Sequence, residues 1–154
     1  MIKKLLIYKV IFLLVVLSLI FYNYQKAQTA LRQARETRLS IEFAKIPDTL
    51  KINQSGAFSW KVDAPNSFST KTTGIYWNYE SSPSALTKYD SPKAVAYHNY
   101  TEDYSTGLFR LPDTFDLNLK FSRAGVVYLR AYALIDNDHL WTQERQIKII
   151  SDEK

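Results

Sequence analysis

The sequence predicts a mainly β protein, in which an N-terminal transmembrane helix with a helical stalk precedes an antiparallel β-sandwich of about seven strands. Residues 5–24 form an apolar run, and at Leu39 the spacing of apolar residues changes from 3.6 to 2. The alternating stretches that follow are separated by turn residues rather than by helices, which favours two packed sheets. With 154 residues, 46% hydrophobic and 23% charged, the chain has the composition of one globular domain.

The apolar run reads LLIYKVIFLLVVLSLIFYNY, and Lys9 is its one charged residue. About 20 helical residues cross a hydrocarbon layer of about 30 Å, so its length suits a membrane span. Lys9 lies near one end, where its long side chain can reach the headgroups, and tyrosines lie at both boundaries. The predicted anchor, residues 1–24, therefore has the lipid bilayer as its partner and contacts it through Leu5, Val10, Leu13, Leu17 and Tyr22.

A cleaved secretory signal also begins with lysines and an apolar run. Ala27 and Ala30 do not have the spacing that a signal peptidase needs, so we expect an uncleaved anchor. Basic residues lie on both sides of the run and nearly balance in the positive-inside rule. We expect the C-terminal domain to be extracytoplasmic, because a short basic N-terminus before an apolar run is how a chain is presented for export.

The stalk, residues 25–38, has good helix formers and contains no Gly or Pro. Ala27, Ala30, Leu31 and Ala34 have helical spacing and form a weakly apolar stripe. Such a stripe would suit either a spacer that continues the anchor helix or a seam for self-association. We favour the spacer, because small alanine side chains bury little area.

The predicted sandwich covers residues 39–150, and residues 151–154 form a polar tail. Apolar residues alternate with polar ones in the stretches 39–44, 50–52, 58–63, 75–79, 115–121, 127–135 and 147–149. This half-polar alternation is typical of antiparallel sheets with one solvated face each. The side chains expected in the core are Phe58, Trp60, Val62, Phe115, Leu117, Leu119 and Leu129.

Three short segments carry a family resemblance. The segment from Phe58 to Pro65, with Trp60 at its centre, resembles the second strand of fibronectin type III and related immunoglobulin-like domains. The segment 125–133 is similar to the penultimate strand of such domains, and 141–144 to their final strand. The resemblance implies an immunoglobulin-like fold over residues 46–150. In the family a tyrosine at the start of the penultimate strand faces inward, whereas the alternation here points Tyr128 outward and Val127 inward.

Composition argues against several function classes. The absence of cysteine excludes disulfides, thiolate metal sites and a cysteine nucleophile. Of the net charge of +5, four charges belong to Lys3, Lys4, Lys9 and Lys26, so the remaining chain is nearly neutral and has no basic stripe for nucleic acid. No nucleophile, metal set or phosphate loop converges in the sequence. We therefore expect no catalytic residues, no cofactor and no enzyme activity.

Residues 81–107 are the longest stretch without sustained periodicity, and they contain Tyr89, Tyr97, Tyr100 and Tyr104 among small polar residues. This mixture is typical of binding loops and makes the four tyrosines candidate partner-binding residues. The alternative is an edge strand near 94–97 within connecting loops whose tyrosines cover the sandwich. The Asp136-Asn137-Asp138 sequence resembles part of a calcium loop, but the residues suit a hairpin turn better.

These features predict a single-pass membrane protein whose extracytoplasmic sandwich is a non-catalytic binding, adhesion or structural module at the cell envelope. Its partner would be a protein or a carbohydrate. The alternative is a pilin-like filament subunit, whose N-terminal helix self-associates in a filament core. The apolar run lacks the glutamate that pilins have at its fifth position. An accessory subunit of a membrane complex is a third option, although Ser18 is the one small residue in the run.

Overall fold

The structure is a computed structural model that describes residues 2–36, 39–65 and 67–151, with the side chains of 2–11 and 33–36 outside the description. The chain consists of two compact units, Met1–Arg38 and Leu39–Lys154. The boundary coincides with the change of hydrophobic period at Leu39, where a helical pattern gives way to strand alternation.

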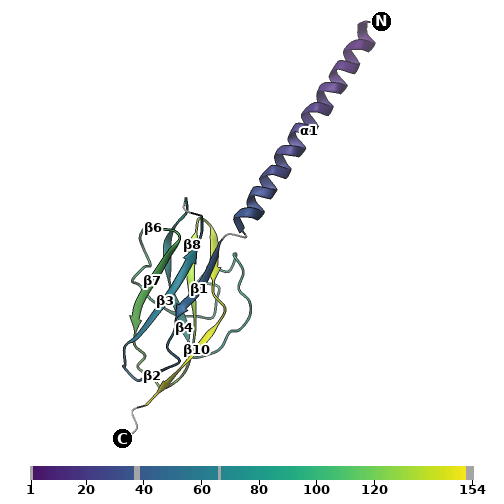
Figure 1. Ribbon diagram of the computed structural model, residues 1–154. Coiled ribbons are helices and arrows are strands. Elements are labelled where there is room, and N and C mark those ends of the chain that lie inside the picture. Colours follow the sequence, from purple (N-terminus) through teal and green to yellow (C-terminus); the bar gives the residue numbers. More distant parts are fainter. Residues whose placement is uncertain (1, 37–38, 66, 152–154) are drawn as a thin grey trace. The chain divides into compact units, whose positions relative to one another are not determined.

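The first unit is one helix, α1 (Ile2–Glu36), which runs without interruption through the boundary predicted between anchor and stalk (Figure 1). Its residues include no glycine or proline that would break the pattern. The Ser18 and Thr29 hydroxyls donate hydrogen bonds to the carbonyls of Leu14 and Gln25, one turn back. Large apolar side chains from Phe12 to Tyr24 are exposed along this unit.

In the part of the chain whose side chains are described, no helix combines the length and apolarity that crossing a membrane requires. Of the predicted anchor residues, Leu13, Leu17 and Tyr22 lie in this part and are more than half exposed, while Leu5 and Val10 lie outside it. The structure thus shows an N-terminal helix and does not support the predicted transmembrane assignment.

The second unit is a β-sandwich of two sheets, and Figure 1 shows them as two layers. Sheet A has the order β1-β3-β7, with β1 (Ser40–Lys45), β3 (Gly56–Asp63) and β7 (Asp113–Leu119). Sheet B has the order β2-β10-β8-β4-β5, with β2 (Thr49–Lys51), β10 (Arg145–Ile150), β8 (Gly125–Ile135), β4 (Ser69–Asn78) and β5 (Asn99–Tyr100). In addition, β6 (Phe109–Arg110) pairs with β4 and β9 (Asp138–Trp141) pairs with β8.

The described residues thus form ten strands where about seven were predicted, because β5, β6 and β9 are too short or too irregular to show alternation. The pairing is antiparallel as predicted, except that β2 runs parallel to β10. Asp136 begins the two-residue turn between β8 and β9 and has a left-handed backbone with φ 53°. The Asp-Asn-Asp sequence thus lies at a hairpin turn, where these residue types tolerate that conformation.

The core lies between the sheets. Of the predicted core residues, Phe58, Trp60, Val62, Phe115, Leu117 and Leu129 are buried, and Leu119 packs half-buried against them. Val127 is fully buried and Tyr128 half-buried, as the alternation along β8 predicts. The buried Trp60 indole N–H donates to Thr73 Oγ1 at 2.8 Å, and Thr73 donates in turn to the Tyr132 carbonyl at 2.6 Å. The polar atom of the largest core side chain is therefore satisfied.

Candidate functional site

Residues 79–98 join β4 to β5 without forming a helix or strand, and we call them the covering segment. They lie against the outer face of sheet B, because they contact Arg130, which alternates along β8 with the core residues Leu129 and Ala131. Outer faces of antiparallel sheets are usually solvated. Here the covering segment buries the centre of that face, and Arg130 is only 2% exposed.

Arg130 donates four hydrogen bonds from its guanidinium. Its Nε donates to the Tyr97 hydroxyl at 2.9 Å and its Nη1 to the Thr142 carbonyl at 2.8 Å. Its Nη2 donates to the carbonyls of Ser82 at 2.9 Å and Ser84 at 2.8 Å. Since a buried cation is costly unless its donors are satisfied, this set explains how β8 accommodates the charge.

Glu144, between β9 and β10, also binds the covering segment. Its carboxylate accepts hydrogen bonds from Ser81 Oγ at 2.6 Å, from the Ser82 N–H at 2.7 Å and from the Tyr97 hydroxyl. Burial raises the pKa of Glu144, but these hydrogen bonds outweigh it and the net pKa is lowered. Glu144 is therefore a carboxylate at neutral pH.

Tyr97 bridges the two charged residues, since it accepts from Arg130 and donates to Glu144. Burial, together with the hydrogen bond to Glu144, raises the pKa of Tyr97 to about 12, so the phenol keeps its proton at neutral pH. We call Arg130, Tyr97 and Glu144 the clasp. These three residues come from β8, the covering segment and the β9–β10 connection, so the clasp fastens the segment to sheet B.

A cluster of aromatic rings, Tyr76, Tyr100, Tyr132, His139 and Trp141, lies beside the clasp on the same face. Tyr76 stacks on Tyr100 with ring centroids 5.5 Å apart, and it meets Tyr132 and Trp141 edge-on. The Tyr132 hydroxyl lies 2.7 Å from His139 Nδ1. The Trp141 indole donates to the Asp90 carbonyl at 2.8 Å, which ties the cluster to the covering segment.

The four candidate tyrosines have different environments. Tyr97 is 2% exposed and belongs to the clasp, while Tyr104 is half-buried among Trp60, Phe109 and Phe115 and donates to the Asp116 carbonyl at 2.9 Å. By contrast, Tyr89 is 81% exposed and Tyr100 49% exposed. Among the four, Tyr89 and Tyr100 are thus the side chains that a partner can reach.

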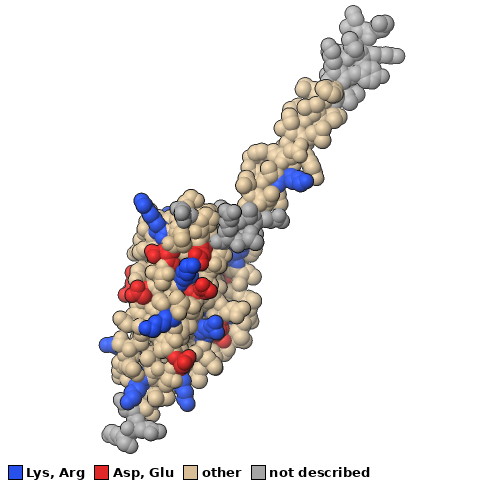
Figure 2. Space-filling model, in the orientation of Figure 1, with Lys and Arg blue, Asp and Glu red and all other residues tan. Residues whose placement is uncertain are grey.

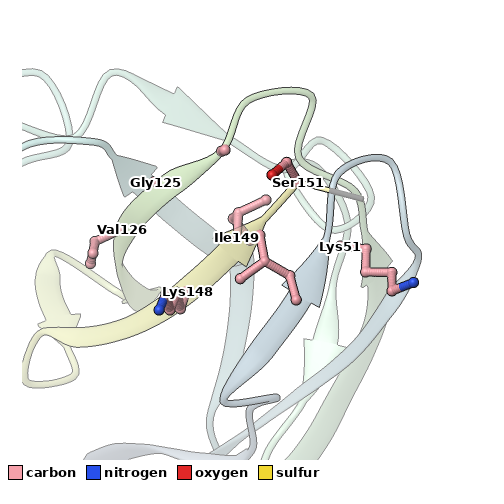
Figure 3. Close-up of a pocket in the computed structure, with 8 residues that line it drawn as sticks. Lys51, Gly125, Val126, Lys148, Ile149 and Ser151 are labelled. Atoms are coloured by element: carbon pink, nitrogen blue, oxygen red, sulfur yellow. The ribbon is translucent and has the colours of Figure 1, made fainter. Parts of the chain in front are cut away.

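A second, separate feature is an open hollow of about 630 Å³ beside β2, β10 and the start of β8 (Figure 3). Its lining residues are Lys51, Ala124, Gly125, Val126, Lys148, Ile149, Ile150 and Ser151. Backbone and aliphatic groups make up most of this lining, and two lysines lie at its rim. The polar side chains of this lining are those of Lys51, Lys148 and Ser151.

Charges are mixed over the sandwich, as the near-neutral composition of this part of the chain predicts. Figure 2 shows lysine and arginine interspersed with aspartate and glutamate on the visible face. One ion pair of the sandwich joins Lys61 Nζ to Asp63 Oδ2 at 2.7 Å. Within the described ranges, no three His, Cys, Asp or Glu side chains are grouped so that they could hold a metal ion.

Sequence reasoning did not select Arg130 or Glu144. The available signal was an arginine in the otherwise apolar strand Gly125–Ile135, at a position that alternates with core residues. Such an outward arginine normally faces solvent. Its burial depends on a covering segment that lies more than thirty residues earlier in the chain, for which the local pattern gives no sign.

Comparison with known proteins finds distant similarities among solved structures. No protein-family model matches the sequence, and no curated protein matches it. Among solved structures, a superoxide reductase (neelaredoxin) from Ignicoccus hospitalis is similar with a TM-score of 0.46 and 13% identity, over 75% of this chain and 85% of that chain. The CARDB domain of a Pyrococcus furiosus protein is similar with a TM-score of 0.42 and 12% identity, over 73% and 87% of the two chains.

A cohesin module from a Clostridium perfringens family 33 glycoside hydrolase is also similar, with a TM-score of 0.37 and 11% identity, over 75% of this chain and 98% of that chain. These similarities are distant and concern the fold alone. The β-sandwich itself follows from the two sheets of this chain, and the similarities supply no immunoglobulin or fibronectin type III name for it.

Proposed function

We propose that this protein is a non-catalytic binding module, which recognises a protein or carbohydrate partner through the covering segment and the adjoining Tyr100. The observation that carries the proposal is the exposure of Tyr89, within a segment that is fastened to sheet B, and of Tyr100, which follows that segment. Tyrosine provides a large contact area at a small cost in conformational entropy, and a rigid scaffold lowers that cost further.

The polar groups of the clasp also favour binding over catalysis. Arg130, Tyr97 and Glu144 direct their hydrogen bonds to one another, to the main chain or serines of the covering segment, and to the Thr142 carbonyl. Arg130 and Tyr97 are each 2% exposed. A group that acts on substrate needs access to it, so these residues are better suited to holding a surface in place.

For the location, we propose that α1 attaches the sandwich to a membrane, with the sandwich on the extracytoplasmic side. Two features support this proposal: the exposed apolar side chains between Phe12 and Tyr24, and the apolar sequence that begins at Leu5. Protease added to intact cells should digest the sandwich under this proposal. A sandwich that is digested only after lysis would contradict the extracytoplasmic location, and full extraction by carbonate without detergent would contradict the attachment.

A second candidate function is a filament subunit, in which copies of α1 bundle and the sandwiches coat them. The observation that favours it is the same exposed apolar helix, because other copies could bury those side chains. Electron microscopy of the purified native protein distinguishes the two candidates. Filaments that are lost in a Leu17→Gln variant would support the subunit, whereas dispersed particles would support the binding module.

Site-specific photo-crosslinking tests the binding surface directly. A photoreactive phenylalanine analogue is placed at Tyr89 or Tyr100 in the protein expressed in its native cells, with Asn118 of β7 on the opposite sheet as the control position. We expect the same crosslinked species from positions 89 and 100 and none from 118. Equal crosslinking from all three positions, or none from 89 and 100, would contradict the proposal.

A further inference from the structure

The covering segment is attached to the sandwich mainly by polar contacts. Its buried hydrophobic residues are Val95 and Tyr97, and neither belongs to the core cluster between the sheets. Tyr79, at the start of the segment, packs partly buried against that cluster. Further along, hydrogen bonds run from Asn78 Nδ2 to the Ala96 carbonyl and from the His139 N–H to the Lys88 carbonyl. Releasing the part from Ser81 to Tyr97 would therefore leave the core cluster between the two sheets covered.

The clasp concentrates much of this attachment at one place. Arg130 fixes the carbonyls of Ser82 and Ser84 near the start of the segment, and Tyr97 fixes its end. Glu144 holds the same two ends through Ser81, the Ser82 N–H and the Tyr97 hydroxyl. The two ends of the segment, more than ten residues apart in sequence, thus depend on a single network of three side chains.

We infer that the clasp is a positioning device, which holds the covering segment as a separable unit and thereby sets the place of Tyr89. Arg130, Tyr97 and Glu144 do not contact the partner; they determine whether the segment between Ser81 and Tyr97 is ordered. Loss of one clasp member releases this segment while the two sheets stay folded. The inference rests on the proposed function only in assigning Tyr89 to the partner, since the release itself is a property of the chain alone.

Guanidinium geometry explains why a lysine cannot replace Arg130 in this role. The planar fork of Arg130 reaches Tyr97, Thr142 and the two serine carbonyls at once, whereas an ammonium is a point charge at the end of a flexible stem. The bridging atom in Tyr97 is the hydroxyl, and phenylalanine would keep the ring while removing both bonds. Arg130→Lys and Tyr97→Phe therefore remove hydrogen bonds of the clasp while changing the size of the side chain little.

Hydrogen exchange by mass spectrometry on the full chain tests the inference. We expect amides of the covering segment to exchange at least about tenfold faster in Arg130→Lys and in Tyr97→Phe than in the wild type, because the opening free energy of a locally held segment falls. Peptides from β3, β7 and β8 should keep their protection. Tyr128→Phe is the matched control, since Tyr128 is half-buried on the same strand as Arg130 and lies outside the clasp.

Two results would overturn the inference. Unchanged exchange of the covering segment in both variants would mean that the clasp does not hold it, and simultaneous loss of protection in segment and strands would mean that it is not a separable unit. Crosslinking from position 89 is measured in parallel and reports on the proposed function. A released segment with undiminished crosslinking at 89 would refute the positioning role and leave the binding proposal intact.

Discussion

Trp60 and Arg130 show how single residues are accommodated on the two faces of sheet-forming strands. Trp60 lies in the core, stacked on Phe115 with ring centroids 5.6 Å apart, and its indole N–H has Thr73 as partner. Arg130 lies on the outer face of sheet B and is buried by a segment without regular structure. In both places the side chain is tolerated because its polar atoms find partners inside the protein.

Replacing Trp60 by alanine should lower the free energy of unfolding by about 3–5 kcal/mol, because a large aromatic side chain is removed from a packed core and leaves a cavity. Urea denaturation followed by circular dichroism measures this change. Thr73→Val should cost less, about 1–3 kcal/mol, because it leaves the buried indole N–H without its acceptor. If both variants unfold at the wild-type midpoint, the packing of Trp60 described above is wrong.

Glu144 should make the attachment of the covering segment sensitive to acid. Its pKa in the folded protein is lowered, so the carboxylate stabilises the fold above the ordinary glutamate pKa of about 4.3, and this contribution is lost as the pH falls through the lower folded value. The residues that set this pKa are Ser81 and Tyr97 of the covering segment, the Ser82 N–H and Arg130 of β8.

Protection factors for the covering segment, corrected for intrinsic exchange rates, should therefore fall between neutral pH and about pH 3 more than those of β3 do. Glu144→Gln should show lower protection at neutral pH and a smaller further change in acid. If the protection factors of the wild-type covering segment fall no more than those of β3 across this range, the carboxylate does not have this role.

At the scale of elements, β4 has three partner strands in sheet B. It pairs with β8 along one edge and with the short strands β5 and β6 along the other. Between β5 and β6, Thr101 lies close to β4, where its hydroxyl accepts from the Ile75 N–H at 3.0 Å and its own N–H donates to the Ile75 carbonyl at 3.0 Å. The close approach is possible because Gly74 has no side chain.

Gly74→Ala should destabilise this junction. A Cβ at position 74 would lie 2.8 Å from Thr101 Oγ1, so Thr101 must move and its bond to Ile75 lengthens. We expect a loss of about 1–3 kcal/mol in unfolding free energy, typical of overpacking at a tight site. The double variant Gly74→Ala with Thr101→Ala should recover part of the loss in the same urea titration, and the absence of any recovery would refute the steric cause.

The fold was predictable where the pattern is local and not where it depends on distant partners. Alternation along residues 58–62 and 115–119 predicts strands and core correctly, since apolar and polar residues alternate within each segment as buried and exposed positions do. The parallel pairing of β2 with β10, the two-residue strands β5 and β6, and the burial of Arg130 all depend on segments that meet only in the folded chain.

The candidate site was half predictable for the same reason. The tyrosine-rich composition of residues 81–107 marks a surface segment, and Tyr89 and Tyr100 are indeed accessible. Nothing in that composition distinguishes them from Tyr97, which the clasp buries, or from Tyr104, which packs beside Trp60. Distinguishing them requires the positions of Arg130 and Phe115, which lie outside the segment.

For the molecule as a whole, the two units contribute unequally to the hydrophobic core. The core cluster and the side chains packed against it all come from Leu39 onward. Residues 39–154 alone should therefore fold, with a urea midpoint close to that of the full chain and the same near-ultraviolet signal from the packed tryptophans. A fragment with strand content but no near-ultraviolet signal would show that the sandwich needs the N-terminal unit.

The central claim is that the sandwich binds its partner through a segment that the clasp holds in place. The most direct measurement is photo-crosslinking from position 89 in native cells, in the wild-type and Tyr97→Phe backgrounds, with position 118 as control. The account predicts one crosslinked species at 89, at least about tenfold less of it in Tyr97→Phe, as expected for a binding surface that loses its preorganisation, and none at 118. Crosslinking at 118 that equals crosslinking at 89 would contradict it.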